Sequence, residues 1–206
     1  CYAMGRLRRI GFPLDEGLAR DLAETLRELR NFWGVDDSVL GKYAFSVLAL
    51  AENGEDVGAE LERLRGSAEK LGVAGCAFAA LAEWRVSGAR ADSPFVRRLK
   101  ALRGADGAWP ADPIPVDERI PGAVVPTALA LEATLCHGSA PAEVAETVRW
   151  LLAQQQEFRW ESTLATAFVV SALARLDPPA REGTEWRISA RLGGEAWVDE
   201  SVPALS

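Results

Sequence analysis

Cys136 and His137 are the neighbouring residues with the most obvious chemical potential, because His137 is the only histidine in the chain. A cysteine nucleophile needs a base whose side chain faces its thiol. Neighbouring residues on a helix point about 100° apart, so the pair indicates a helix end beside a buried thiol rather than a catalytic dyad. A zinc site would need more ligands, and the sequence has no second histidine and no Cys-x-x-Cys pair.

Clustered carboxylates are the second candidate, since glycoside hydrolysis uses two positioned acids. The Gly- and Pro-rich segment 104–122 holds such a cluster at Asp106, Asp112, Asp117 and Glu118. Asp36 and Asp37 stand directly before Ser38, which indicates the start of a helix rather than the acid motif of a terpene cyclase. Most other acids fall on charged helices, where solvated side chains are the ordinary expectation.

The hydroxyl and indole side chains are expected to cap helices and to pack against them. Ser162 and Thr163 precede an apolar run with Thr166 one turn later, which predicts a helix N-cap rather than a nucleophile. The tryptophans stand mostly at helix ends or amphipathic positions, where packing is their usual role; they are residues 33, 84, 109, 150, 160, 186 and 197. We therefore expect no catalytic residue, no metal ligand and no cofactor in this chain.

Composition narrows the class of protein. The chain has 206 residues, 49% hydrophobic content and a net charge of −7, which fits a folded protein and disfavours nucleic acid or an anionic membrane as a partner. Three scattered cysteines do not suggest a disulfide framework. The abundance of Arg, Ala and Gly hints at a bacterial source. The start at Cys1, without an initiator methionine, suggests a fragment of a longer protein.

Hydrophobic periodicity predicts about nine helices that alternate between nearly all-apolar and charged amphipathic segments. The expected apolar helices cover 2–10, 38–53, 71–87, 123–136 and a last one that follows Arg159 and ends near Arg175. The expected charged helices cover 15–31, 56–66, one that starts at Ser93–Pro94, and one from Ala142 to about Gln154. An inner ring of apolar helices inside an outer ring of charged ones explains this order, so we expect an all-α, α/α-toroid. A plain helix bundle is the competing arrangement, although it would give every helix a similar single stripe.

Two domains are expected, a partial toroid at 1–178 and a short β segment at 179–206. Trp186, Ile188, Ala190 and Leu192 recur at every second residue, which is strand spacing. Gly193–Gly194 then predicts a turn before a second strand at 196–198. A closed six-hairpin toroid needs about twelve helices, so about three are expected before Cys1. Uncovered inner-helix faces would then favour self-association.

Several of these segments resemble the helical, thioester-containing domain of the alpha-macroglobulin and complement family. The matching residues are VRWLLAQQ at 148–155, RWESTLATA at 159–167, Ala172–Leu173, YAFSVLALA at 43–51, and the Trp109 loop leading into PTAL at 126–129. The family has a helix ending W-x-x-x-Q-Q, an aromatic loop, and S-T-x-x-T opening an Ala/Leu-rich helix. The resemblance spans about residues 38–200, and it implies a toroid followed by a strand that leads to a β-sandwich domain.

The family's thioester motif, Cys-x-Glu-Gln, does not follow any of the three cysteines. The resemblance therefore implies a non-catalytic helical part of an alpha-macroglobulin-like protease inhibitor, forming a structural wall of the thioester domain. It also implies a periplasmic or extracellular location, with target proteases and neighbouring β domains of the same protein as partners. Two alternatives remain open: an α/α-toroid enzyme of the terpene cyclase or prenyltransferase type, and a helical-repeat module that binds proteins.

Overall fold

The computed structural model describes residues 2–9, 15–33, 39–90, 92–112, 122–157, 159–176, 185–192 and 195–203. The chain divides into two compact units, Cys1–Arg175 and Leu176–Ser206. The described residues of the first unit are mostly helical, which confirms the predicted all-α character of this part. The predicted boundary between residues 178 and 179 lies outside the described residues.

The described part of the first unit contains nine α-helices, the number that the periodicity predicts. They are α1 Tyr2–Arg9, α2 Glu16–Trp33, α3 Leu40–Glu52, α4 Gly58–Gly66, α5 Val73–Ser87, α6 Pro94–Leu102, α7 Val124–Cys136, α8 Pro141–Ala153 and α9 Thr163–Ala174. A short 3-10 helix, η2 Ala68–Lys70, precedes α5. None of these helices combines the length and hydropathy that crossing a membrane requires.

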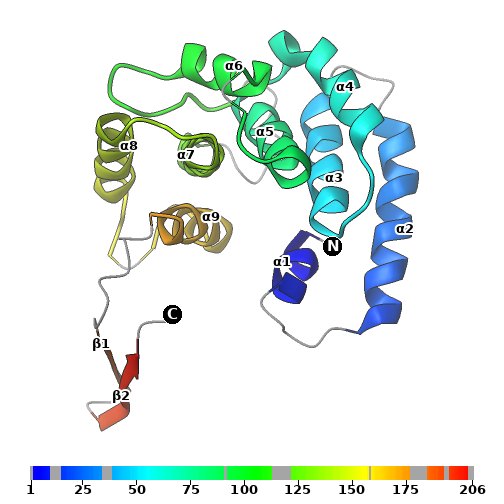
Figure 1. The fold of residues 1–206 in the computed structure, drawn as a ribbon. Helices are drawn as coiled ribbons and strands as arrows, with labels where there is room; N and C mark the ends of the chain where they lie inside the picture. Colours follow the sequence, from blue (N-terminus) through cyan, green and yellow to red (C-terminus); the bar gives the residue numbers. More distant parts are fainter. Residues whose placement is uncertain are drawn as a thin grey trace. The chain divides into compact units, whose positions relative to one another are not determined.

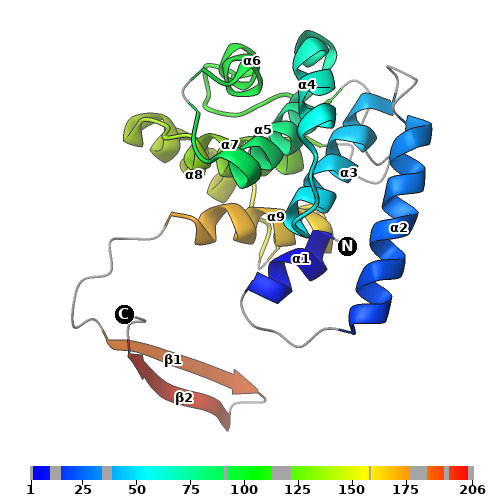
Figure 2. The ribbon, with the colours of Figure 1, turned by 45° about the vertical axis from the view of Figure 1, so that its right-hand side comes forward.

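Four apolar helices form an inner row, whereas α1, which was expected to be apolar, carries three arginines. α3, α5, α7 and α9 pack side by side in chain order, and α1 packs against α3 (Figure 1). The charged helices lie against this row: α2 on α3, α4 on α3 and α5, α6 on α5 and α7, and α8 on α7 (Figure 2). Every residue from Val73 to Glu83 of α5 and from Val124 to Thr134 of α7 is buried. Over these stretches the two helices are enclosed on all sides, as their lack of a polar face predicts.

The helix ends follow the local sequence signals. Gly54 and Gly88 have a positive φ after α3 and α5, of 84° and 76°, which glycine adopts without strain because it has no Cβ. Ser93 caps α6 by accepting a hydrogen bond from the Val96 N–H at 3.4 Å. Ser162 caps α9 in the same way, from the Ala165 N–H at 3.0 Å. The predicted cap at Asp37 or Ser38 lies outside the described residues.

Trp109, in the loop between α6 and α7, is hydrogen-bonded to both helices. The Trp109 indole Nε1 donates to the Leu99 carbonyl of α6 at 2.7 Å, and its backbone N–H donates to Thr127 Oγ1 of α7 at 3.0 Å. Thr127 is the fourth residue of α7. One buried residue thus connects the end of a charged helix to the first turn of the next apolar helix.

The same joint recurs between α8 and α9. Trp160 Nε1 donates to the Leu151 carbonyl at 2.6 Å, and the Trp160 N–H donates to Thr166 Oγ1 at 3.1 Å. Thr166 is again the fourth residue of its helix. We call each of these two arrangements a tryptophan joint. The two tryptophans make the same pair of bonds, although the Thr127 hydroxyl donates to the Trp109 carbonyl and the Thr166 hydroxyl to the Ser162 carbonyl.

The nearly all-apolar sequence of α9 predicts burial on nearly all sides, and this prediction is wrong for the described structure. Leu164 and Val170 are 43% and 54% exposed, and the buried residues of α9 are Ala165, Val169 and Ala172. In α8, Leu151 is buried, whereas the neighbouring Leu152, which is also apolar, is 50% exposed. Periodicity reports which faces are apolar, but burial also requires a neighbouring element, and α9 is the last helix of the inner row.

The second unit contains a two-stranded antiparallel hairpin. β1 is Glu185–Leu192 and β2 is Glu195–Pro203. Trp186 pairs with Val202 and Ala190 with Val198, and the register shifts by a bulge between Ala190 and Arg191. β2 extends beyond the expected 196–198 because its pairing with β1 continues to Pro203.

Candidate functional site

The main concentration of polar side chains inside the described first unit surrounds Glu132, an acid in the otherwise apolar helix α7. Glu132 is 1% exposed. Its Oε1 accepts from Arg6 Nη2 at 3.0 Å and from Arg175 Nε at 2.7 Å. Its Oε2 accepts from the Ser171 hydroxyl at 3.2 Å. A buried carboxylate is costly unless it is paired and hydrogen-bonded, and here both oxygens have partners.

Arg6 brings α1 into this cluster. Its Nη1 donates to the Tyr2 hydroxyl and to Ser171 Oγ, both at 2.8 Å. Burial, followed by the nearby charge of Glu132, raises the pKa of Tyr2 to about 12, so its phenol stays protonated at neutral pH. Burial alone would lower the pKa of Arg6, but Glu132 and Tyr2 raise it above its usual value. We call Tyr2, Arg6, Glu132, Ser171 and Arg175 the Glu132 cluster.

Arg175 connects the cluster to α5. Its guanidinium lies 5.0 Å from the centre of the Trp84 ring, in a cation–π contact. Arg175 is the C-cap residue of α9, where a positive charge also interacts favourably with the helix dipole. The cluster therefore ties α1, α5, α7 and α9 together.

The geometry of the Glu132 cluster is that of a structural ion pair. A general base needs an oxygen that is free to take a substrate proton, whereas both oxygens of Glu132 already accept hydrogen bonds. Each arginine is also largely enclosed, with 28% and 22% of the Arg6 and Arg175 side chains exposed. The arrangement is suited to fixing helix positions.

Two further acids of the inner row are buried and paired. Glu83 of α5 is 0% exposed, and its Oε1 accepts from Arg65 Nε at 3.1 Å and Nη2 at 2.6 Å. Glu52, at the end of α3, lies 3.5 Å from Arg85 Nε. Sequence reasoning assigned the acids in general to solvated faces and missed these three residues. A detectable signal was present, because an acid inside an apolar helix must be matched by a cation.

Cys136 and His137 have different surroundings and different contacts. His137 Nδ1 accepts from the Arg90 N–H at 3.0 Å, and Nε2 lies 3.0 Å from the Ala80 carbonyl. Nδ1 also lies 3.2 Å from the Arg90 carbonyl. These contacts attach the end of α7 to α5 and to the loop that follows α5. Burial raises the pKa of the Cys136 thiol to about 11. The pair thus lies at the end of α7, and both imidazole nitrogens of His137 contact backbone groups.

The acids of the 104–122 loop are placed separately by the structure. Asp112 lies far from α5 in the sequence but caps this helix. Its carboxylate accepts hydrogen bonds from the Val73 and Ala74 N–H groups. Burial raises the pKa of Asp112, although the two backbone donors oppose this. Asp106 is exposed and accepts from the Ala108 N–H at 3.2 Å. Asp117 and Glu118 lie outside the described residues, as do Asp36 and Asp37.

The remaining sequence candidates have structural contacts. Cys76 is buried in α5, with its Sγ 3.8 Å from the Ala68 carbonyl, and burial raises the pKa of its thiol to about 12. Trp109 and Trp160 are buried in the tryptophan joints, and Trp150 is packed against the core. The side chains of Trp33, Trp186 and Trp197 are outside the described part. Within that part, no group of three or more His, Cys, Asp or Glu side chains is arranged to hold a metal.

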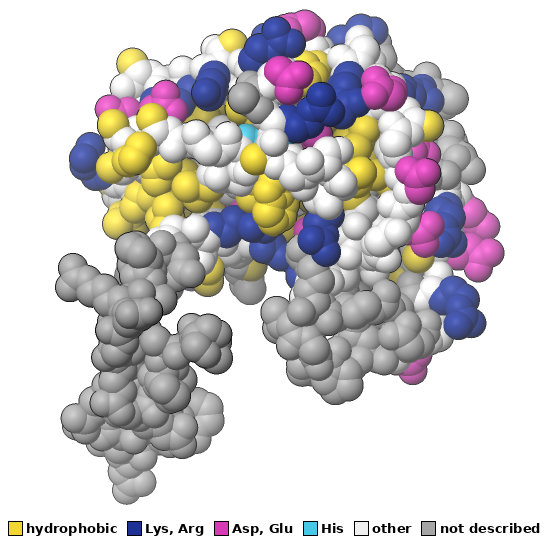
Figure 3. Space-filling view, viewed as in Figure 1, with side chains coloured by type: hydrophobic (Ala, Val, Ile, Leu, Met, Phe, Trp, Pro, Cys, Tyr) yellow, Lys and Arg dark blue, Asp and Glu magenta, His cyan; other side chains and the backbone are white. Residues whose placement is uncertain are grey.

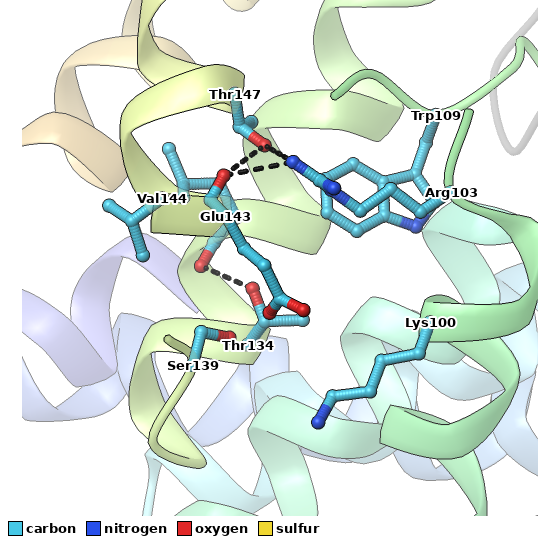
Figure 4. Close-up of a pocket in the computed structure, with 9 residues that line it drawn as sticks. Lys100, Arg103, Trp109, Thr134, Ser139, Glu143, Val144 and Thr147 are labelled. Atoms are coloured by element: carbon cyan, nitrogen blue, oxygen red, sulfur yellow. Dashed lines mark hydrogen bonds between the residues drawn. The ribbon is translucent and has the colours of Figure 1, made fainter. Parts of the chain in front are cut away.

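A small pocket lies between α6, α7 and α8. Figure 4 shows Lys100, Glu143 and Thr134 around it, with Arg103 lying across Trp109 (Figure 4). Arg103 Nη2 donates to the Glu143 carbonyl at 2.9 Å and to Glu146 Oε2 at 3.0 Å. The cavity volume is about 10 Å³, which is room for about one water molecule. Its size does not suit an organic substrate.

Comparison with protein-family models gave no match, and comparisons with curated proteins and with solved structures gave none either. The resemblance to the alpha-macroglobulin family therefore stays a prediction from the sequence segments at 43–51, 126–129, 148–155, 159–167 and 172–173 and from the Trp109 loop.

Proposed function

We propose that this chain is a non-catalytic helical part of an alpha-macroglobulin-like protease inhibitor, in which it forms a structural wall of the thioester domain. The observation that carries the proposal is the enclosure of α5 and α7, each buried over its first eleven residues by small and apolar side chains. A row of such helices forms a closely packed layer. A cyclase or prenyltransferase would instead need a substrate cavity beside this row.

The state of the chemistry-bearing side chains supports the same proposal. Glu132 and Glu83 accept hydrogen bonds from arginines, and His137 is bonded to the backbone. Cys76 and Cys136 have pKa values raised to about 12 and about 11, which leaves little thiolate at neutral pH. These groups serve helix packing, the role expected of a wall.

We further infer that the alternation of inner and outer helices continues around an α/α toroid in the parent protein. The inner row of α3, α5, α7 and α9, with charged helices against it, supports this inference. The hairpin of β1 and β2 would then begin the path into a neighbouring β domain. A periplasmic or extracellular location follows from the same proposal, as do proteases as the targets of the parent protein.

A trapping assay tests the function. The full-length protein that contains this chain is incubated with a broad-specificity protease, and hydrolysis of a small peptide substrate is compared with hydrolysis of a large protein substrate. Trapping predicts that hydrolysis of the protein substrate is lost while hydrolysis of the small peptide is retained. Loss of both activities would indicate an active-site inhibitor, and retention of both would refute inhibition.

A further inference from the structure

The helix α1 connects the two ends of the inner row. It packs against α3, the first helix of the row, and its Arg6 bonds to Ser171 of α9, the last one. Figures 1 and 2 both show α1 beside α3 and near α9. The contacts of α1 toward α3 can therefore be compared with its contacts toward α7 and α9, and the two sets differ in kind.

The side of α1 that faces α3 is held by aromatic rings and by close backbone contact. The centre of the Tyr2 ring lies 6.0 Å from that of Phe45 on α3, and Phe45 lies 5.2 Å from Phe78 on α5. Gly5 is buried, and a Cβ at this position would come within 2.7 Å of the Glu52 carbonyl oxygen. A glycine is needed where two backbones approach this closely. These contacts pair no charges, so they are insensitive to salt.

The side of α1 that faces α7 and α9 is held by one cation. Arg6 Nη2 donates to Glu132 Oε1 of α7 at 3.0 Å, and Arg6 Nη1 donates to Ser171 Oγ at 2.8 Å. Among the described side chains, Arg6 alone carries the hydrogen bonds of α1 to these two helices. The Arg6 side chain is 28% exposed, so water and salt reach this contact. Figure 3 shows Lys and Arg side chains at the surface between α9 and α1.

Glu132 keeps a complete set of partners when Arg6 is taken away. Arg175 Nε donates to the same oxygen, Oε1, at 2.7 Å, and the Ser171 hydroxyl donates to Oε2 at 3.2 Å. A buried carboxylate left without a cation is strongly destabilising, but release of Arg6 still leaves one cation for one carboxylate. Arg6 itself then gains water and keeps Tyr2 of its own helix as a partner. The contact of α1 with α7 and α9 can therefore open without leaving a buried charge unpaired.

We propose that α1 is a salt-sensitive strap, which opens and closes at the α9 end of the inner row. In the closed state Arg6 bonds to Glu132 and Ser171. In the open state α1 stays packed on α3, while Glu132 stays bonded to Arg175 and Ser171. Such a strap allows the row to open at one position without the unfolding of any helix. The strap concerns contacts within the first unit, so it is independent of the proposed inhibitory function.

Paramagnetic relaxation in the 206-residue chain tests the strap. The natural cysteines are replaced by alanine, and a nitroxide is attached through Val170→Cys, at a 54% exposed position on α9 that adjoins Ser171. The closed strap brings the amides of α1 near this label and broadens their signals. Raising NaCl from about 10 mM to about 1 M shortens the Debye length from about 30 Å to about 3 Å, and it should reduce this broadening reversibly by at least about twofold. The amides of α7, which packs on α9, should stay broadened.

The strap predicts opposite results for two arginine substitutions in the labelled chain. Arg6→Gln removes the cation of the strap, so the broadening of α1 should already be at least about twofold lower at about 10 mM NaCl. Arg175→Gln leaves Arg6 as the remaining cation of Glu132, so α1 should stay broadened even at about 1 M NaCl. A network that only fixes the helices would loosen in both variants, and this result would overturn the proposal.

Two outcomes in the chain with both arginines would also overturn it. The first is equal broadening of α1 at the two salt concentrations. The second is a loss of the nuclear Overhauser effects between the Tyr2 and Phe45 rings at high salt, which would show that α1 leaves α3 as well. Circular dichroism of each variant verifies that the helices are intact.

Discussion

Replacing Glu132 by Gln should destabilise the first unit more than any comparable change at an exposed acid. Gln keeps the shape of the side chain but removes its charge, and its amide group brings donors to a place where Arg6, Arg175 and Ser171 already donate. Removing one partner from a buried ion pair costs about 3–5 kcal/mol. Because the two arginines are partly exposed and can turn toward water, we expect about 3 kcal/mol here.

The assay is thermal unfolding followed by circular dichroism. For a unit of this size, about 3 kcal/mol corresponds to a fall in Tm of about 6–12 °C. Glu146→Gln is the matched control, since Glu146 also pairs with an arginine but 50% of its side chain is exposed. An exposed pair of this kind contributes about 0–1 kcal/mol. Equal effects of the two substitutions would refute the view that the Glu132 cluster fixes the helices.

Hydrogen exchange separates local from global effects of the same change. Arg6 is the residue through which α1 bonds to α7 and α9, so the amides of α1 should lose protection first in the Glu132→Gln variant. Full protection of α1 in a destabilised variant would show that α1 is held by its packing on α3 rather than by the cluster.

Three further predictions concern stability and reactivity. Trp160→Phe keeps an aromatic ring but removes the indole donor to the Leu151 carbonyl, which still accepts from the Gln154 N–H, so unfolding should require about 0.5–1.5 kcal/mol less in urea titrations; an unchanged midpoint would show that the ring alone makes the joint. Asp112→Ala removes the cap of α5 and should cost about 1–2 kcal/mol in the same titration, whereas Asp106→Ala should change little. At pH 8, folded Cys76 should be alkylated by iodoacetamide at least about 100 times more slowly than after unfolding, since its raised pKa leaves almost no thiolate; comparable rates by peptide mass mapping would contradict its burial.

The elements of this fold were predictable because each depends on residues close in sequence. The alternation of apolar and charged segments gave nine helices, and short signals such as Ser93–Pro94 and Ser162 marked helix starts that the structure has. Capping bonds span three residues, so they can be read from a local pattern. The two tryptophan joints were not predicted, although the residues that form them were noted as packing positions.

The Glu132 cluster was not predictable in the same way. Arg6 and Glu132 are 126 residues apart, and Asp112 caps a helix that begins 39 residues earlier. Pairing over such separations depends on how the helices pack, and the chain contains 23 basic and 30 acidic residues from which to choose partners. The exposed Leu164 and Val170 of α9 are the converse case, since an apolar face is visible in the sequence but the presence of a neighbouring element is not.

The tryptophan joints make the spacing between paired helices independent of the length of chain that connects them. Trp109 precedes its threonine by 18 residues and Trp160 by 6, yet both make the same two bonds. Closing the longer loop costs only about 1 kcal/mol more in chain entropy, because that cost rises with the logarithm of length. The connection between Asp112, which caps α5, and Val124, where α7 begins, is therefore the position at which an inserted reporter or affinity tag should disturb the helices least.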